Sequence, residues 1–246
     1  MQENIVIYGA TSTLAQHIAR HLATNGHRLF LIARSEARLA TLSKDYVARG
    51  AASVDLLAAD LSELNKLEHL WDTIVSKMKV IHKVFVCHGV LGNQEIAQKD
   101  FLTAQSELTT NFLSYVAILT PIANQFEVDG GGHITVIGSV AGDRGRQSNY
   151  IYGTAKAGLA TFAAGLRNRL SQSNVQVLTV KPGFMRTAMT ENLDQNFLFA
   201  EPEKVAQSIL KAVDQKRDVI YVPGFWRLIM LVIRNIPEKI FKRLKL

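Results

Sequence analysis

The chain has 246 residues, of which 48% are hydrophobic and 20% are charged. This is the composition of a globular protein, and it argues against intrinsic disorder and collagen-like repeats. The single cysteine, Cys87, excludes an internal disulfide and a cysteine-rich zinc site. The formal net charge is +7, so an acidic partner such as nucleic acid has to be considered first.

The positive charge is concentrated at one end of the chain. Residues 227–246 contain six Lys or Arg and one Glu, a net charge of +5, which leaves +2 for the first 226 residues. A nucleic-acid-binding protein needs a basic face on its folded body, so nucleic acid is not expected as a partner. No segment has the ~18 uninterrupted apolar residues of a membrane-spanning helix. Acidic Glu3 before a short apolar run is not typical of a secretory signal, so we expect a cytoplasmic protein.

Short apolar runs alternate with longer amphipathic stretches. The runs predict strands at 5–8, 29–32, 54–59, 84–87, 133–137, 175–180 and 218–222. The stretches between them predict helices at about 12–25, 35–49, 61–79, 98–126, 150–170 and 203–215. This alternation predicts an α/β protein with a single doubly wound Rossmann fold, in which helices cover both faces of a seven-stranded parallel sheet. We expect one domain over 1–223 and a C-terminal amphipathic tail over 224–246.

The first predicted strand leads into a turn of small residues, Gly9-Ala10-Thr11-Ser12-Thr13-Leu14-Ala15. Small residues let the backbone approach a pyrophosphate, and the N-terminus of the following helix attracts its charge. The candidate cofactor-binding residues here are Gly9, Thr11, Ser12, Thr13 and Leu14. Two positions of the usual G-x-x-x-G-x-G spacing are Thr13 and Ala15, so a plain strand-to-helix turn is the alternative.

The ends of the second and third predicted strands indicate which dinucleotide would bind. A carboxylate after the second strand would bind the ribose hydroxyls of NAD, but Arg34 stands there. Because arginine pairs with phosphate in a bidentate way, Arg34 predicts NADP(H), with a solvated surface arginine as the alternative. Asp60 and Leu61, after the third strand, are placed to meet the adenine edge, and Asp60 can also cap the next helix.

Tyr152 and Lys156 are four residues apart at the start of a predicted helix and therefore share one face. We expect the charge of Lys156 to lower the pKa of Tyr152 from its usual ~10, and Lys156 to hold the nicotinamide ribose. Tyr152 would then donate a proton near neutral pH. Ser139 follows the fifth predicted strand, where its hydroxyl would polarise a substrate carbonyl. Tyrosine and lysine at this spacing are usually a surface pair. A nucleotide turn, then a serine at a strand end, then a tyrosine and a lysine at the start of a helix, in this order, are a much rarer combination.

With these motifs, residues 3–225 resemble the short-chain dehydrogenase/reductase family. The resemblance implies that Ser139, Tyr152 and Lys156 are catalytic and that Tyr152 and Lys156 also contact the cofactor. It implies that Asn111 holds a proton-relay water. It also places the 181–187 stretch beside the nicotinamide carboxamide, which makes cofactor contacts of Pro182, Gly183, Met185 and Thr187.

One motif departs from the family pattern. The family's Asn-Asn-Ala-Gly after the fourth strand is Val86-Cys87-His88-Gly89 here. Gly89 is carried over as a cofactor contact. A structural hydrogen bond near the adenine ribose, which depends on the two asparagines, is not expected here. A nucleophilic pair of Cys87 and His88 is not expected, because adjacent strand residues point to opposite faces. His17 and His21 have the spacing of two zinc ligands, but no third ligand is evident and no metal site is expected.

The tail has an apolar run at 228–233, with Trp226 before it and basic residues around it. This combination is typical of a helix at a membrane interface, and Pro237 is expected to break it into two pieces. The alternative is an extension that packs on the body or on a second subunit. The tail and the nucleotide turn resemble the branch of the family that contains the keto-reductase component of decaprenylphosphoryl ribose 2-epimerase. That resemblance implies a lipid-linked substrate, a keto sugar on a polyprenyl phosphate, and peripheral contact with the inner face of a membrane.

Together these features predict an NADP(H)-dependent oxidoreductase that reduces a carbonyl to an alcohol by hydride transfer, with Tyr152 as the proton donor. The stretch 188–200 is expected to form a lid over the small-molecule or lipid-linked substrate. One alternative is a soluble NADPH-dependent reductase of ketones or 3-oxoacyl thioesters. Another, from a different class, is a non-catalytic NADP(H)-binding regulator. The family resemblance also implies a homo-oligomer.

Overall fold

The computed structural model describes residues 1–67, 69–191, 194 and 196–244. Its strands form one sheet in the order β3-β2-β1-β4-β5-β6-β7, and all neighbouring strands are parallel. The strands are β1 (Asn4–Tyr8), β2 (Arg28–Ala33), β3 (Ser53–Ala58), β4 (Lys83–Val86), β5 (Gly132–Ile137), β6 (Val175–Pro182) and β7 (Val219–Val222). The doubly wound α/β fold predicted from the sequence is therefore confirmed.

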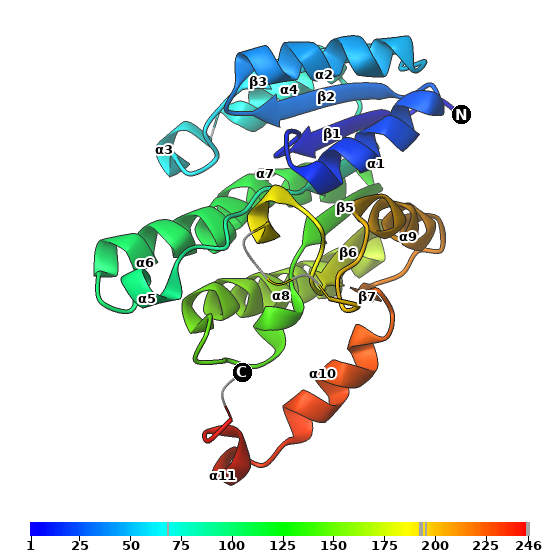
Figure 1. The fold of residues 1–246 in the computed structure, drawn as a ribbon. Coiled ribbons are helices and arrows are strands. Elements are labelled where there is room, and N and C mark those ends of the chain that lie inside the picture. Colours follow the sequence, from blue (N-terminus) through cyan, green and yellow to red (C-terminus); the bar gives the residue numbers. More distant parts are fainter. Residues whose placement is uncertain (68, 192–193, 195, 245–246) are drawn as a thin grey trace.

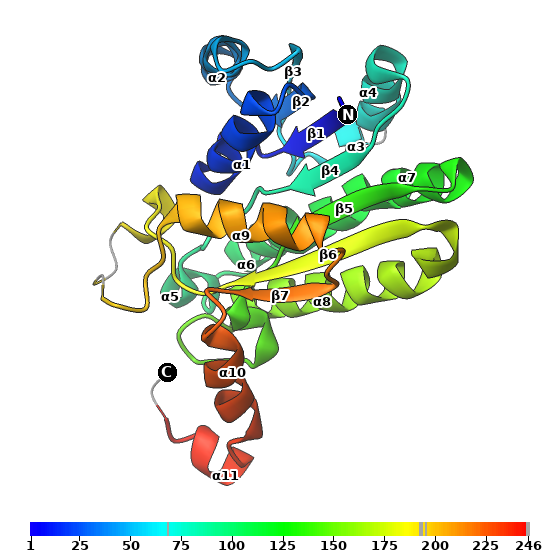
Figure 2. The ribbon, with the colours of Figure 1, turned by 90° about the vertical axis from the view of Figure 1, so that its right-hand side faces the viewer.

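Helices cover both faces of this sheet (Figures 1 and 2). One face carries α1 (Thr13–Thr24), α2 (Glu36–Ala48) and α9 (Pro202–Asp214), and the other carries α4 (Leu70–Met78), α7 (Ser114–Asp129) and α8 (Tyr150–Leu170). Ile5 and Ile7 of β1 point into the core with α1, whereas Val6 and Tyr8 point into the core with α7. Because both faces are covered, the strands are continuous apolar runs rather than alternating ones.

Two helices differ from the sequence prediction. The helix expected at 61–79 is divided into α3 (Leu64–Leu67) and α4, with residue 68 outside the described residues. The helix expected at 98–126 is preceded by α5 (Gln94–Ala97), starts as α6 (Phe101–Leu108) and reaches α7 through a π-helical turn at Thr109–Leu113. The helices expected to begin at 61 and 98 thus begin at Leu64 and Phe101. Both shifts have local causes, because Asp60 accepts from the Ser62 N–H and Asp100 accepts from the Thr103 N–H. Such side-chain contacts favour turns and helix caps over helix interiors.

The tail forms two helices, α10 (Trp226–Asn235) and α11 (Glu238–Phe241), below the end of β7 in Figure 1. They are separated before Pro237, as predicted, because Ile236 is extended with ψ 124°. Trp226 and Met230 are buried against the body, whereas Leu228 is 67% exposed on the other side of α10. The packed and the exposed faces of the tail thus belong to the same helix.

Arg144 of the body fastens the tail. Its Nη1 donates to the carbonyl oxygens of Ile233 at 2.7 Å and Ile236 at 2.6 Å, and its Nη2 donates to Glu238 at 2.8 Å. The guanidinium also lies 3.6 Å from the ring centroid of Phe241. Arg144 therefore binds carbonyl groups at the end of α10, where a helix has few partners of its own for them. Over the described part of the chain, no helix is both long enough and apolar enough to cross a membrane.

Candidate active site

The predicted site residues gather where the strands end. Gly9 follows β1, Gly89 follows the end of β4, Ser139 follows β5 and Gly183 follows β6. The carboxyl ends of parallel strands meet at one edge of a sheet, and doubly wound proteins bind their ligands there. The first turns of α8 bring Tyr152 and Lys156 to the same edge.

A cavity of about 160 Å³ collects most of the predicted residues at this edge. Those in its lining are Ser12, Thr13, Leu14, Gly89, Ser139, Tyr152, Lys156, Pro182, Gly183, Met185 and Thr187. The nucleotide turn, the strand-end serine and the tyrosine–lysine pair, which are far apart in the sequence, thus face one space.

The Ser139, Tyr152 and Lys156 side chains form the centre of this cavity. Lys156 is 3% exposed, and its Nζ donates to the Ile137 carbonyl at 3.0 Å. The same Nζ lies 5.7 Å from the centre of the Tyr152 ring. The Ser139 hydroxyl accepts from the Ala141 N–H at 3.1 Å, and Ser139 lies close enough to Tyr152 to influence its pKa. A hydroxyl, a phenol and an ammonium therefore line the same cavity.

The expected lowering of the Tyr152 pKa by Lys156 is wrong for the protein alone. Burial raises the pKa of Tyr152 to about 12; the hydrogen bond with Ser139 opposes this shift and the Glu107 charge adds to it. Burial also lowers the pKa of Lys156 to about 8. The physical reason is that burial removes water from both groups, which disfavours the charged tyrosinate and the charged ammonium. Tyr152 is thereby kept protonated, which is the form that can donate to a carbonyl oxygen.

Asn111 is fully buried in the π-helical turn and binds the turn after β4. Its Oδ1 accepts from the Val90 N–H at 3.0 Å, and its Nδ2 donates to the carbonyls of Val90 at 2.9 Å and Glu107 at 3.1 Å. A Cβ on Gly89 would lie 2.8 Å from this Oδ1 and 3.6 Å from the Lys156 Nζ. The contacts of Asn111 thus position the backbone beside Lys156, and its role with a relay water stays a prediction.

The nucleotide turn has the shape that a pyrophosphate requires. Gly9 has a φ of +71°, and a Cβ there would lie 2.6 Å from the main-chain nitrogen of His88. Ser12 caps α1 by accepting from the Ala15 N–H at 3.3 Å. Other N–H groups of the first turn of α1 have no partner within the helix and can bind an anion. The turn therefore fits a dinucleotide, with small side chains and a helix N-terminus together.

One arginine that the sequence analysis missed contacts this turn. The predicted Arg34 is exposed, and its charge adds to the lowering of the Asp60 pKa that the Ser62 N–H produces. Arg38 donates from Nη2 to the Thr11 carbonyl at 3.2 Å. Its position in the first turn of α2, shortly after the second strand and Arg34, was the available signal.

Leu61 is less accessible than its predicted role requires. Its side chain is 5% exposed and belongs to the core with Leu67 and Trp71. Only the main chain of Leu61 could therefore make the predicted contact with adenine.

His88 lines the cavity, and its two ring nitrogens have different surroundings. Ser114 donates its hydroxyl hydrogen to the Thr110 carbonyl at 2.8 Å, so His88 Nε2, 2.7 Å from the Ser114 oxygen, is assigned as the protonated nitrogen. The other ring nitrogen, Nδ1, is buried and has no hydrogen-bond partner among the residues that the structure describes. Burial lowers the His88 pKa to about 3, so the ring is neutral at physiological pH. A ligand hydroxyl that reached this nitrogen would satisfy it, at a position that corresponds to the alanine of the family's Asn-Asn-Ala-Gly.

Cys87 and His88 face different surroundings. Cys87 is packed in the core with α1 and α9, whereas the His88 ring stacks on Tyr115 with centroids 4.3 Å apart. Burial also raises the pKa of the Cys87 thiol to about 12. Within the described ranges, no three His, Cys, Asp or Glu side chains are placed to hold a metal ion.

A second cavity, of about 600 Å³, adjoins the first at Tyr152. Its walls include Trp226, Ile229 and Ile233 of α10, which were predicted to lie outside the catalytic domain. The Trp226 indole covers Gly183 so closely that a Cβ there would lie 1.9 Å from Nε1. The tail therefore forms part of the site.

The segment 188–200 also contributes to this second cavity. The contributing residues are Asp194, Asn196, Leu198 and Phe199. Residues 192, 193 and 195 of the expected lid lie outside the described residues.

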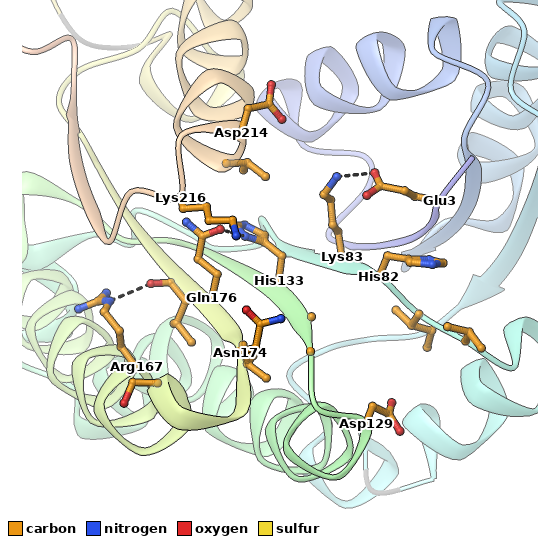
Figure 3. Close-up of a pocket in the computed structure, with 18 of the residues that line it drawn as sticks. Glu3, His82, Lys83, Asp129, His133, Arg167, Asn174, Gln176, Asp214 and Lys216 are labelled. Carbon is orange, nitrogen blue, oxygen red and sulfur yellow. Dashed lines mark hydrogen bonds and ion pairs between the residues drawn. The ribbon is translucent and has the colours of Figure 1, made fainter. Parts of the chain in front are cut away.

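A larger hollow, of about 890 Å³, lies at the opposite edge of the sheet (Figure 3). It is lined by charges of both signs, several of which have partners within the hollow. Lys83 pairs with Glu3, and His133 Nδ1 lies 3.0 Å from the Gln176 oxygen. None of the predicted site residues lines it. Its size alone therefore does not make it the active site.

The short chain dehydrogenase family matches residues 3–197. The chain belongs to this family. An uncharacterized oxidoreductase of Mycobacterium tuberculosis is 32% identical over 240 residues, which cover 98% of this chain and 96% of the relative. An uncharacterized oxidoreductase of Streptomyces coelicolor is 29% identical over 243 residues, covering 98% and 95%. The protein is therefore an NAD(P)-dependent oxidoreductase of the short-chain dehydrogenase family.

Solved structures share the fold at low sequence identity. A short-chain dehydrogenase from Sphingobium yanoikuyae in complex with NADPH is 24% identical, with a TM-score of 0.81 and coverage of 96% of this chain and 97% of that one. A single-residue variant of actinorhodin polyketide ketoreductase with NADPH is 21% identical, with a TM-score of 0.80 and coverage of 91% and 97%.

Proposed function

We propose that this oxidoreductase reduces a carbonyl to an alcohol with NADPH, using Ser139, Tyr152 and Lys156 as its catalytic groups. The observation that carries the proposal is the position of Tyr152 where two cavities meet. One cavity contains the nucleotide turn and Lys156, and the other contains the tail and the 188–200 segment. A cofactor and a substrate would thus approach the same phenol from two sides.

The three groups have complementary tasks. Bound NADPH supplies the hydride. The Ser139 hydroxyl donates a hydrogen bond to the substrate oxygen, and Tyr152 transfers its phenolic proton to that oxygen as negative charge develops on it. The Lys156 ammonium, close to the Tyr152 ring, then stabilises the tyrosinate that remains. Asn111 supports this arrangement by holding the backbone next to Lys156.

Other predicted residues would hold the cofactor. The turn at 9–14 would bind the pyrophosphate, and Asp60 with the Leu61 main chain would lie near adenine. The nicotinamide end would be surrounded by five residues that all line the smaller cavity: Gly89, Pro182, Gly183, Met185 and Thr187.

The preference for NADPH is assigned to Arg34 and Arg38. The double variant Arg34→Ala, Arg38→Ala is expected to weaken NADPH binding by about tenfold to a hundredfold, because each charged hydrogen bond to phosphate is lost. NADH has no 2′-phosphate, so its affinity should be nearly unchanged. Titrations of cofactor fluorescence measure both affinities. Equal losses for the two cofactors, or no loss for either, would contradict the assignment.

For the substrate we propose a keto sugar on a polyprenyl phosphate, presented at the inner face of a membrane. The outer face of α10 supports this, because Leu228, Leu231 and Val232 are 67%, 59% and 66% exposed beside basic residues. Such a face suits an anionic bilayer surface.

Vesicle flotation tests the membrane contact. The chain is expected to float with phosphatidylglycerol vesicles and to stay below phosphatidylcholine vesicles. The triple variant Leu228→Ser, Leu231→Ser, Val232→Ser should no longer float, since it changes only the exposed face. Val128→Ser, at an 83% exposed position on α7, is the matched control. Flotation of the triple variant like the wild type would contradict the proposed contact.

A substrate screen separates the remaining alternatives. NADPH oxidation is measured with polyprenyl-phosphate keto sugars, with soluble ketones and with 3-oxoacyl thioesters. Turnover of only the soluble compounds would favour the soluble reductase and overturn the lipid-linked substrate. Tight NADPH binding with no oxidation across the whole panel would favour the regulator. The homo-oligomer expected from the family is a separate prediction, which light scattering of the purified chain tests.

A further inference from the structure

Arg146 places a cation in the wall of the site. It lies between the short 3-10 helix Val140–Asp143 and α8, and it lines both cavities that meet at Tyr152. Over the described part of the chain, its buried Nε has no hydrogen-bond partner. Its Nη2 contacts the Met230 sulfur at 3.5 Å, and a thioether is a weak acceptor. A half-buried guanidinium with so few partners is costly, which marks the position as one that a ligand can complete.

The charged neighbours of Arg146 are already engaged with other groups. Burial lowers the pKa of Arg146 and the charge of Asp143 opposes this shift, but the Asp143 carboxylate is paired with Lys181 and accepts from the Tyr221 hydroxyl at 2.7 Å. Arg144, two residues earlier, is committed to the tail. The neighbouring loop therefore contains one arginine that fastens the tail and one that faces the cavity.

Two further carboxylates, Glu107 and Asp194, line the second cavity, the one of about 600 Å³. Within the described residues, no ion pair joins either of them to Arg146. Burial raises the pKa of Glu107, which disfavours its charged form. An anion that enters the cavity would thus meet little competition for the Arg146 guanidinium.

The rest of the second cavity is mostly apolar. Phe184, Leu198, Phe199, Trp226, Ile229 and Ile233 contribute to its walls. These side chains come from three segments: the stretch after β6, the 188–200 segment and α10. The cavity therefore offers a cation near the catalytic tyrosine and a hydrophobic wall beyond it.

We infer that Arg146 selects the substrate by charge, binding a phosphate ester near the carbonyl while the wall of α10 takes an apolar chain attached to it. This inference rests on the proposed function, because it assumes that the substrate carbonyl binds at Tyr152. A guanidinium binds phosphate oxygens through two parallel hydrogen bonds, which gives orientation as well as affinity. Arg146 is thus a specificity-determining residue, and it takes no part in proton transfer.

The test measures binding by calorimetry on the full chain with NADPH present. Three probes are compared: geranyl phosphate, geraniol and inorganic phosphate. Wild-type protein is expected to bind geranyl phosphate at least about tenfold more tightly than geraniol, because a charged hydrogen bond is gained. Arg146→Met should remove this preference and leave geraniol binding unchanged. Arg217→Met, at an exposed position outside both cavities, removes the same charge and should keep the preference.

Each contrary result has a defined meaning. A preference for geranyl phosphate that survives in Arg146→Met, or is absent from the wild type, would overturn the role of Arg146. Inorganic phosphate that binds as tightly as geranyl phosphate would overturn the role of the apolar wall, because the anion alone would then be the ligand. NADPH affinity and thermal unfolding of Arg146→Met identify a folding defect, in which case Arg146→Lys, which keeps the charge, is expected to retain part of the preference. The assay needs no turnover, so its failure is distinguishable from failure of the catalytic assignment.

Discussion

Tyr152→Phe is expected to lower the rate of carbonyl reduction by about 10²- to 10⁴-fold, which is the usual contribution of a positioned general acid. The substitution removes one hydroxyl and keeps the ring next to Lys156. Burial raises the Tyr152 pKa to about 12, so in the wild type this hydroxyl carries its proton at assay pH. NADPH affinity should change little. Steady-state NADPH oxidation and a fluorescence titration measure the two effects separately.

A neighbouring tyrosine provides the matched control for this experiment. Tyr150 is in the same turn of α8 but is 42% exposed. Tyr150→Phe removes an equivalent hydroxyl and should leave turnover unchanged. Wild-type turnover by Tyr152→Phe would refute the assignment of Tyr152 as proton donor.

Gly9→Ala is expected to give the largest loss of stability among single-methyl changes in the nucleotide turn. The φ of +71° costs an L-residue about 1–2 kcal/mol. The new Cβ would also lie 2.6 Å from the His88 nitrogen and 2.8 Å from its Cα, and this backbone cannot rotate away as a flexible side chain would. Together we expect a loss of about 3 kcal/mol or more. For a chain of this size, that lowers the midpoint of thermal unfolding by about 6–12 °C.

The same substitution at Gly145 tests whether the effect is local. Gly145 has no atom within 4 Å of a built Cβ and no positive φ, so Gly145→Ala should leave the melting temperature nearly unchanged. Gly9→Ala should also weaken NADPH binding, since the turn must move to relieve the overlap. A Gly9→Ala protein that melts with the wild type and binds NADPH equally well would contradict the close approach of β1 and the turn after β4.

The strands were predictable because the local pattern and the tertiary environment agree. Residues such as Ile5 to Tyr8 are apolar on both faces, and the sheet does bury both faces. Helix boundaries were less predictable, because they depend on specific hydrogen bonds. The π-helical turn around Asn111 illustrates this, since its side chain binds Val90, a residue in a different segment.

The chemistry of the site divides in a similar way. The order of Ser139, Tyr152 and Lys156 between a strand and a helix was sufficient to nominate them together. Their pKa values were not predictable, because burial, which only the folded chain produces, raises the pKa of Tyr152 and lowers that of Lys156. Arg38 and Arg146 were missed for a related reason, since the contact of Arg38 with Thr11 and the burial of Arg146 Nε both depend on residues distant in the chain.

The alternation of strands and helices, the nucleotide turn, the catalytic candidates and the basic, apolar character of the tail could all be predicted from the sequence. These features depend on residue type and short-range spacing, which the chain carries locally. The position of the tail, in contrast, depends on long-range contacts. Trp226 packs on Gly183 and Arg144 binds the end of α10, so one face of the tail becomes a wall of the site while the other stays exposed. Contacts between residues so distant in the chain arise from packing of the whole fold, and no local pattern encodes them.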